Sequence, residues 1–141
     1  MKKLYLGSAI VAVLGLVACS SDTSIDAPAP LVSEGEAWSM AESMLQAYNS
    51  GDYGAWSRDW SDEMKAAIDQ ATFGGFREQM FAVTGRFLEL KSVELKPGEQ
   101  DPDVARYEFM ASFERDDDVL FMIAFYPGSR KIDGVQVEPE P

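Results

Sequence analysis

Carboxylates and tyrosine hydroxyls are the side chains of this sequence that could perform acid–base chemistry. Asp59 and Glu63 are close enough in the chain to lie near one another, and paired carboxylates can divide the roles of acid and base. Tyr107, with Tyr48 or Tyr53, could present hydroxyls to a pocket and polarise a substrate carbonyl. Both carboxylates fall in short segments with polar faces, however, and a buried tyrosine more often packs its ring and bonds a backbone carbonyl. We therefore assign no catalytic residue, and a non-enzymatic protein is favoured over an enzyme.

Two groups of side chains could bind metal ions. Glu114 and the acidic residues 116–118 could hold calcium, but they lack the alternating ligands, central glycine and distal glutamate of an EF-hand loop. A charged hairpin tip that blocks edge-to-edge pairing of strands explains them better. Met40 and Met44 lie one helical turn apart and could bind copper, although their apolar neighbours favour a place in the core. Because the chain also has no histidine, the commonest transition-metal ligand, we predict neither a metal nor a cofactor.

Large aromatic side chains could line a binding pocket for a small hydrophobic ligand. The three tryptophans, Trp38, Trp56 and Trp60, are the main candidates, and core packing explains them equally well. The full set of predicted pocket residues is Trp38, Tyr48, Trp56, Trp60, Tyr107 and Phe109. Both interpretations stay open at this point.

The composition indicates a folded, strongly acidic domain. The chain has 141 residues, of which 46% are hydrophobic, so it can form a core. It carries 24 acidic and 12 basic residues, a formal charge of −12. A domain with this charge repels phosphate backbones, so nucleic acid is not an expected partner.

The first 18 residues have the three parts of an export signal. Lys2 and Lys3 form its positive end, residues 4–14 are a nearly unbroken apolar run, and residues 16–18 lead into Cys19. The run is too short to span a bilayer comfortably, which favours a cleaved signal over a permanent anchor. Leu-Val-Ala-Cys resembles the bacterial lipobox, in which the cysteine sulfur takes a diacylglycerol before cleavage. The resemblance predicts a lipoprotein held to the membrane through Cys19.

Two other interpretations of this leader are a plain transmembrane anchor and a secreted protein with an incidental cysteine. The small, polar and proline-bearing residues 20–30 favour the lipoprotein, because that composition suits a tether between lipid and domain. We expect a signal peptide over 1–18, the lipidated cysteine and tether over 19–32, and one domain over 33–139. The expected location is the extracytoplasmic side of the cell envelope, and Ser20 after the cysteine points to the outer membrane in a Gram-negative organism.

Helical periodicity occupies the first half of the domain. Ser33 with Glu36 forms a capping box before an apolar stripe that ends near Gly51. Asp52 and Ser61 are expected to cap two short helices, and a fourth helix is expected over 73–83.

Strands follow, over residues 87–95, 104–113, 119–126 and 132–137. Residues 119–126 are apolar at every position, as expected of a central strand covered on both faces. The side of the strand that carries apolar residues switches near residues 91–92 and again at Gly134, which predicts a bulge or bend at each place. Residues 115–118 are expected to form a charged hairpin loop. The whole pattern predicts an α+β domain, with N-terminal helices packed on a strongly curved, four-stranded antiparallel sheet.

The helix over 37–48, the following Asn-Ser-Gly-Asp-Tyr at 49–53, and the paired tryptophans resemble nuclear transport factor two-like domains. Gly-Arg-Phe at 85–87 and Lys-Ile-Asp-Gly-Val at 131–135 continue the resemblance, which covers about residues 33–139. It implies a conical fold that hosts enzymes, ligand carriers and interaction modules, so it does not select a function. Enzymes of this superfamily commonly place a His, Asp or Tyr inside the cone, and this chain lacks the histidine.

We therefore expect a membrane-anchored, non-enzymatic module that binds a small hydrophobic ligand or a protein. The alternatives are a small enzyme acting on a hydrophobic carbonyl compound and an accessory subunit that forms a homodimer through its sheet.

Overall fold

The computed structural model of the chain describes residues 30–139. The predicted signal peptide, Cys19 and the tether up to residue 29 lie outside the described residues. Four helices come first and four strands follow: α1 (Glu34–Ser50), α2 (Tyr53–Trp56), α3 (Asp62–Ala67), α4 (Gln70–Thr84), β1 (Phe87–Pro97), β2 (Ala105–Phe113), β3 (Asp116–Phe125) and β4 (Gly134–Glu138). The α+β class is therefore confirmed.

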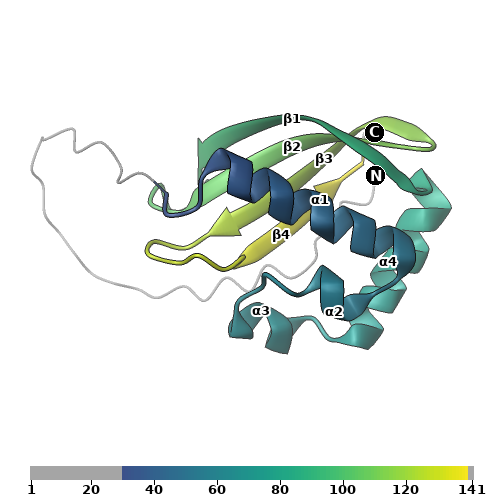
Figure 1. Ribbon diagram of the computed structural model, residues 1–141, viewed down its shortest axis with the longest axis horizontal. Coiled ribbons are helices and arrows are strands. Elements are labelled where there is room, and N and C mark those ends of the chain that lie inside the picture. Colours follow the sequence, from purple (N-terminus) through teal and green to yellow (C-terminus); the bar gives the residue numbers. More distant parts are fainter. Residues whose placement is uncertain (1–29, 140–141) are drawn as a thin grey trace, which may run out of the picture.

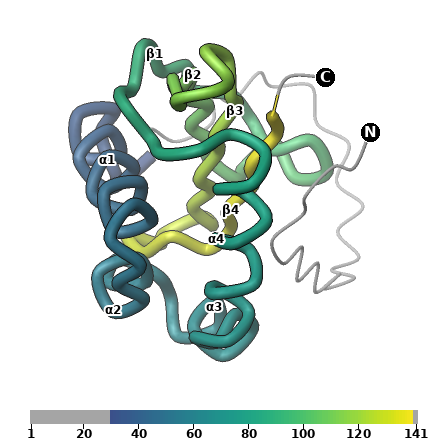
Figure 2. Tube along the Cα trace, turned by 90° about the vertical axis from the view of Figure 1, so that its right-hand side faces the viewer, coloured from purple at the N-terminus to yellow at the C-terminus, as the bar shows by residue number. Residues whose placement is uncertain are grey.

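The strands form one antiparallel sheet in the order β1-β2-β3-β4, as predicted. Helix α1 crosses one face of this sheet, and α2 and α3 lie together at one end of the domain (Figures 1 and 2). The sheet twists without curling strongly (Figure 1), so the predicted strong curvature is not confirmed. The two switches in the apolar pattern have local causes instead.

The first switch is a register shift between β1 and β2. Leu90 pairs with Ala111 and Ser92 pairs with Met110, so Lys91 has no opposing residue. This confirms the predicted bulge. The second switch arises because Ile132 is not in β4: it forms an isolated bridge with Trp60, and the strand begins two residues later. The predicted start of the last strand at Ile132 is therefore wrong.

The predicted charged loop over 115–118 is also wrong, because β3 already begins at Asp116. Lys91 lies against these acidic residues. Its ammonium group donates to the Asp117 carbonyl oxygen and forms an ion pair with Asp118 at 2.7 Å, while Ser112 donates to the Asp117 carboxylate at 3.2 Å. Lys91, which has no partner in β2 because of the bulge, thus brings a positive charge to the acidic start of β3.

Capping residues determine where the helices begin. The capping box of α1 is present: Glu36 accepts from the Ser33 amide at 2.8 Å, and Ser33 accepts from the Glu36 amide at 3.2 Å. Asp52 and Ser61 cap α2 and α3 as predicted. Helix α4 begins earlier than predicted, because Asp69 caps it by accepting from the Thr72 amide at 2.8 Å.

Asn49, near the end of α1, joins that helix to the sheet. Its side-chain oxygen accepts from the Phe87 amide at 2.8 Å, and its side-chain nitrogen donates to the Phe87 carbonyl at 2.8 Å. This amide therefore satisfies both backbone groups of Phe87, as a neighbouring strand would. It fixes the end of α1 against the first residue of β1.

Candidate functional site

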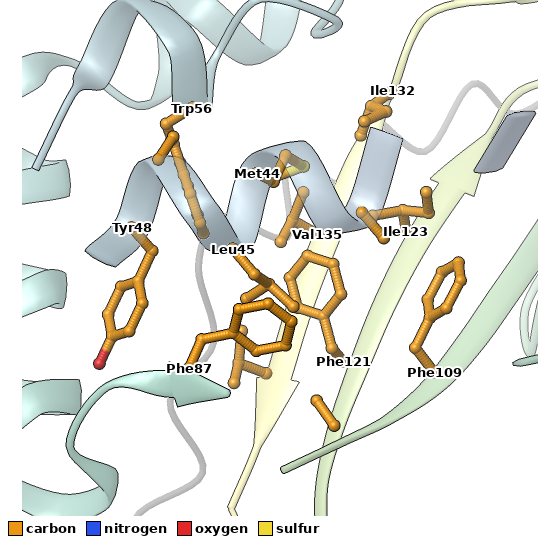
Figure 3. Packing of buried hydrophobic residues seen from close by; sticks show 14 of the residues in the cluster. Met44, Leu45, Tyr48, Trp56, Phe87, Phe109, Phe121, Ile123, Ile132 and Val135 are labelled. Atoms are coloured by element: carbon orange, nitrogen blue, oxygen red, sulfur yellow. The ribbon is translucent and has the colours of Figure 1, made fainter. Parts of the chain in front are cut away.

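The structure places the predicted pocket residues in the core. Trp56, Trp60, Tyr48, Tyr107 and Phe109 are each at most 1% exposed, and all belong to one buried cluster between the helices and the sheet. In Figure 3, Tyr48 and Leu45 from α1 point toward the sheet, from which Phe109 and Phe121 rise. Trp38 is only half-buried and contacts Phe109 edge-to-face at 6.1 Å between ring centroids.

Aromatic contacts fill the space between these residues. The rings of Trp56 and Trp60 lie 6.1 Å apart, and Tyr48 stacks on Phe81 at 4.8 Å. The gap in this cluster has no room for a water-sized sphere, and its lining is Leu45, Tyr48, Trp56, Phe76, Met80, Phe113 and Val137. The gap enclosed by these side chains is therefore far too small for a ligand, because small-molecule sites measure roughly 300–1,000 Å³.

The three tyrosine hydroxyls considered for catalysis are engaged with the backbone. Tyr48 donates to the Gly85 carbonyl at 2.9 Å, Tyr53 donates to the Ile68 carbonyl, and Tyr107 donates to the Val32 carbonyl. Each hydroxyl thus stabilises a distant turn or chain end. A substrate carbonyl would have to displace these bonds inside a filled core.

Tyr48 gives a testable pH dependence. Burial raises the pKa of Tyr48 to about 12, from an ordinary value of about 10. Because the folded pKa lies above the unfolded one, this contribution to stability is complete below pH 10 and is lost as the pH rises toward 12. We expect the urea midpoint of the protein to fall steeply across that window. Tyr48→Phe should show a shallower fall, although burial also raises the pKa of Tyr107. An equal slope in both proteins contradicts the prediction.

The candidate carboxylates are not brought together by any contact. Asp59 forms an ion pair with Arg58 at 3.1 Å, whereas Glu63 is exposed in the first turn of α3. The proposed copper ligands separate in the same way: Met44 is buried and Met40 packs half-exposed against the core. In the described part of the chain, no group of three or more acidic or cysteine side chains is arranged to hold a metal ion.

One surface outside the core combines apolar and charged side chains. It is the face of the sheet turned away from the core, and we call it the outer sheet face. Its apolar residues are Met110, Leu120, Met122 and Ala124, of which Met110 pairs with Leu120 across β2 and β3. Met122 is only 5% exposed, yet it is not a member of the core cluster. The sequence indicated that β3 is apolar on both faces but did not show that these residues form a separate group.

An ion-pair cluster borders these apolar residues. Glu108, paired with Met122 in the sheet, contacts Lys96 Nζ at 2.7 Å and Arg106 Nη2 at 3.3 Å. Arg106 also reaches Glu99 at 3.1 Å. The Glu108 side chain is only 10% exposed, and its hydrogen bond raises the pKa of Lys96. The outer sheet face is therefore an apolar centre with a fixed, mixed-charge border.

No protein-family model, curated protein or solved structure matches this chain. Over residues 30–139, no helix has both the length and the hydropathy that crossing a membrane requires.

Proposed function

We propose that this protein is a lipoprotein of the cell envelope, anchored through Cys19 on the extracytoplasmic side, whose domain binds another protein through the outer sheet face. The observation that carries the binding role is a filled interior beneath an apolar patch on the opposite side of the sheet. A carrier of small hydrophobic ligands needs an open cavity, and an enzyme needs free polar groups inside one. An interaction module needs neither.

The outer sheet face has the composition of a protein-binding surface. Such surfaces have an apolar centre and a polar rim, and methionine side chains adapt to a partner's shape. Met110 and Met122 supply such side chains, and the Glu108 cluster supplies the rim. The cluster presents both negative and positive groups at the edge of the surface. It therefore favours a partner that carries charges of both signs at the facing positions.

We also infer that this α+β domain is related to the nuclear transport factor two-like domains. Helices that precede an antiparallel meander support it, as does α1 lying on one face of that sheet. Domains of this kind host interaction modules, which agrees with a filled interior. In a Gram-negative organism, Ser20 after the cysteine supports an anchor in the outer membrane.

Site-specific photo-crosslinking in intact cells tests the proposed surface. A photoreactive amino acid replaces Leu120, which is half-buried on the outer sheet face opposite Met110, and in the control it replaces Val83, which is 56% exposed on α4. We expect a discrete cross-linked protein from position 120 and none of that mass from position 83. A product of twice the monomer mass identifies a homodimer, the alternative occupant of the same face. Equal labelling from both positions, or no product from position 120, overturns the proposal.

A further inference from the structure

A second surface, formed entirely by helices, carries a separate inference. A groove of about 500 Å³ lies between α4 and the end of α1, and we call it the α4 groove. Its volume falls in the range of small-molecule sites, roughly 300–1,000 Å³. Its lining residues are Gly51, Gln70, Phe73, Gly74, Arg77, Glu78 and Phe81.

Six of these seven residues form one stripe along α4, at the spacing of successive helical turns. Gly74 is the floor of the stripe, because a methyl group placed there would meet no atom within 4 Å. The rings of Phe73 and Phe81 belong to its apolar wall, and Phe81 also stacks on Tyr48. A glycine floor between aromatic rings exposes flat apolar surface to a ligand.

Arg77 is the only cation of the groove. Its Nε donates to the Tyr48 carbonyl at 2.6 Å, and its Nη2 donates to the Asn49 carbonyl at 2.9 Å. The guanidinium also lies 4.5 Å from the centre of the Phe81 ring. A guanidinium has five N–H donors, so three remain, and two of them lie along the Nη1–Nη2 edge, which suits a carboxylate. Among residues 30–139, no carboxylate lies within 4 Å of this half-buried cation.

Glu78 is the only anion of the groove, and it also forms no ion pair with a described residue. Consecutive residues of a helix point about 100° apart around its axis. Within the stripe, Arg77 and Glu78 therefore lie on opposite sides of the line from Gly74, one turn before them, to Phe81, one turn after. This arrangement holds two opposite charges apart across an apolar strip.

We propose that the α4 groove binds a short peptide with free ends and an apolar body, its terminal carboxylate on Arg77 and its terminal ammonium group on Glu78. A single amino acid carries both charges on one carbon, whereas the groove separates them by the width of the stripe. The apolar side chain of the peptide lies over Gly74, against the ring of Phe81. This site shares no residue with the outer sheet face, so either proposal can fail alone.

Calorimetric titration of the full chain in lipid nanodiscs tests the proposal, with empty nanodiscs as the blank. The probe is the dipeptide Ala-Phe, compared with its N-acetylated form, its C-terminal amide and free phenylalanine. We expect Ala-Phe to bind and the affinity of each blocked form to be at least about tenfold lower, because each lacks one charge-assisted contact. Blocked forms that bind as well as Ala-Phe overturn the proposal, as does an absence of binding by Ala-Phe.

Two adjacent glycines of α4 provide a matched pair of variants. Gly74→Leu fills the floor of the groove, whereas Gly75→Leu adds the same side chain outside it, and neither position has an atom within 4 Å of the new Cβ. Both changes replace a helical glycine, so both should raise the thermal midpoint. We expect Gly74→Leu to abolish binding and Gly75→Leu to change it by less than about twofold. Equal losses overturn the proposal.

Glu78→Gln tests the ammonium contact at an exposed position. We expect it to weaken Ala-Phe about tenfold and to leave the weaker N-acetylated form unchanged, since that form has no ammonium group. This comparison tests the binding mode even if Gly74→Leu fails to fold. An equal effect on Ala-Phe and its N-acetylated form would mean that Glu78 does not contact the ammonium group, and would overturn the binding mode.

Discussion

Cys19→Ala is expected to release the protein from the membrane. The sulfur of Cys19 is the proposed attachment point for a diacylglycerol, and the chain has no second cysteine to replace it. One acyl chain holds a protein only marginally, whereas two or three hold it stably, at roughly 0.8 kcal/mol for each buried methylene. Loss of all of them therefore removes the anchor. Metabolic labelling with a palmitate analogue, followed by separation of membrane and soluble fractions, measures the effect.

The matched control is Ser20→Ala, which changes the next residue and keeps the thiol. It should be labelled as strongly as the unaltered chain and should stay in the membrane fraction. Labelling of Cys19→Ala at the level of the unaltered chain would show that the lipid is attached elsewhere or not at all. Such a result removes the proposed location and leaves the two surfaces of the domain unaffected.

Trp56→Ala is expected to cause the largest loss of stability among single substitutions in the core. The Trp56 ring contacts Tyr48, Trp60, Phe73 and Phe76, with centroids 5.1–6.5 Å away. Its removal leaves a cavity where α1, α2 and α4 meet, and replacing a buried tryptophan by alanine costs about 3–5 kcal/mol of unfolding free energy. Urea denaturation followed by near-ultraviolet circular dichroism measures this loss.

Trp56→Phe is the matched comparison, because it keeps a ring and removes the indole nitrogen. That nitrogen has no hydrogen-bond partner among the described residues, so its removal leaves no other polar group unpaired. We expect Trp56→Phe to cost clearly less than Trp56→Ala. A loss of less than about 1 kcal/mol for Trp56→Ala would mean that the core around α2 collapses freely to fill the cavity.

Local signals in the sequence predicted most of the secondary structure. Ser33 with Glu36 identified the start of α1, and the apolar switch near Lys91 identified the bulge in β1. The boundaries that were missed depend on contacts made elsewhere. Asp116 pairs with Phe113 of β2 at the start of β3, where Lys91 of β1 contacts the next two residues, and Ile132 lies outside the last strand and pairs with Trp60.

The candidate sites were harder to predict, because they depend on how distant segments pack. The pattern of Trp56 and Trp60 is the same for a core and for a pocket wall, and only the packed structure distinguishes the two. The α4 groove requires Arg77 to reach the end of α1, 28 and 29 residues earlier in the chain. Its local signal in the sequence is the pair of adjacent glycines, Gly74 and Gly75, within α4.

The hydrogen bond from Tyr107 to the Val32 carbonyl sets a limit on where the domain can work. It attaches the chain to the sheet thirteen residues after Cys19, and thirteen residues reach at most about 47 Å in any conformation. With lipid on Cys19, the attachment point stays within that radius of the bilayer surface. Helix α1 starts beside this attachment point and is about 25 Å long, and the α4 groove lies at its far end. The proposed anchor therefore implies that partners of the two surfaces lie within a layer about 7 nm deep above the membrane.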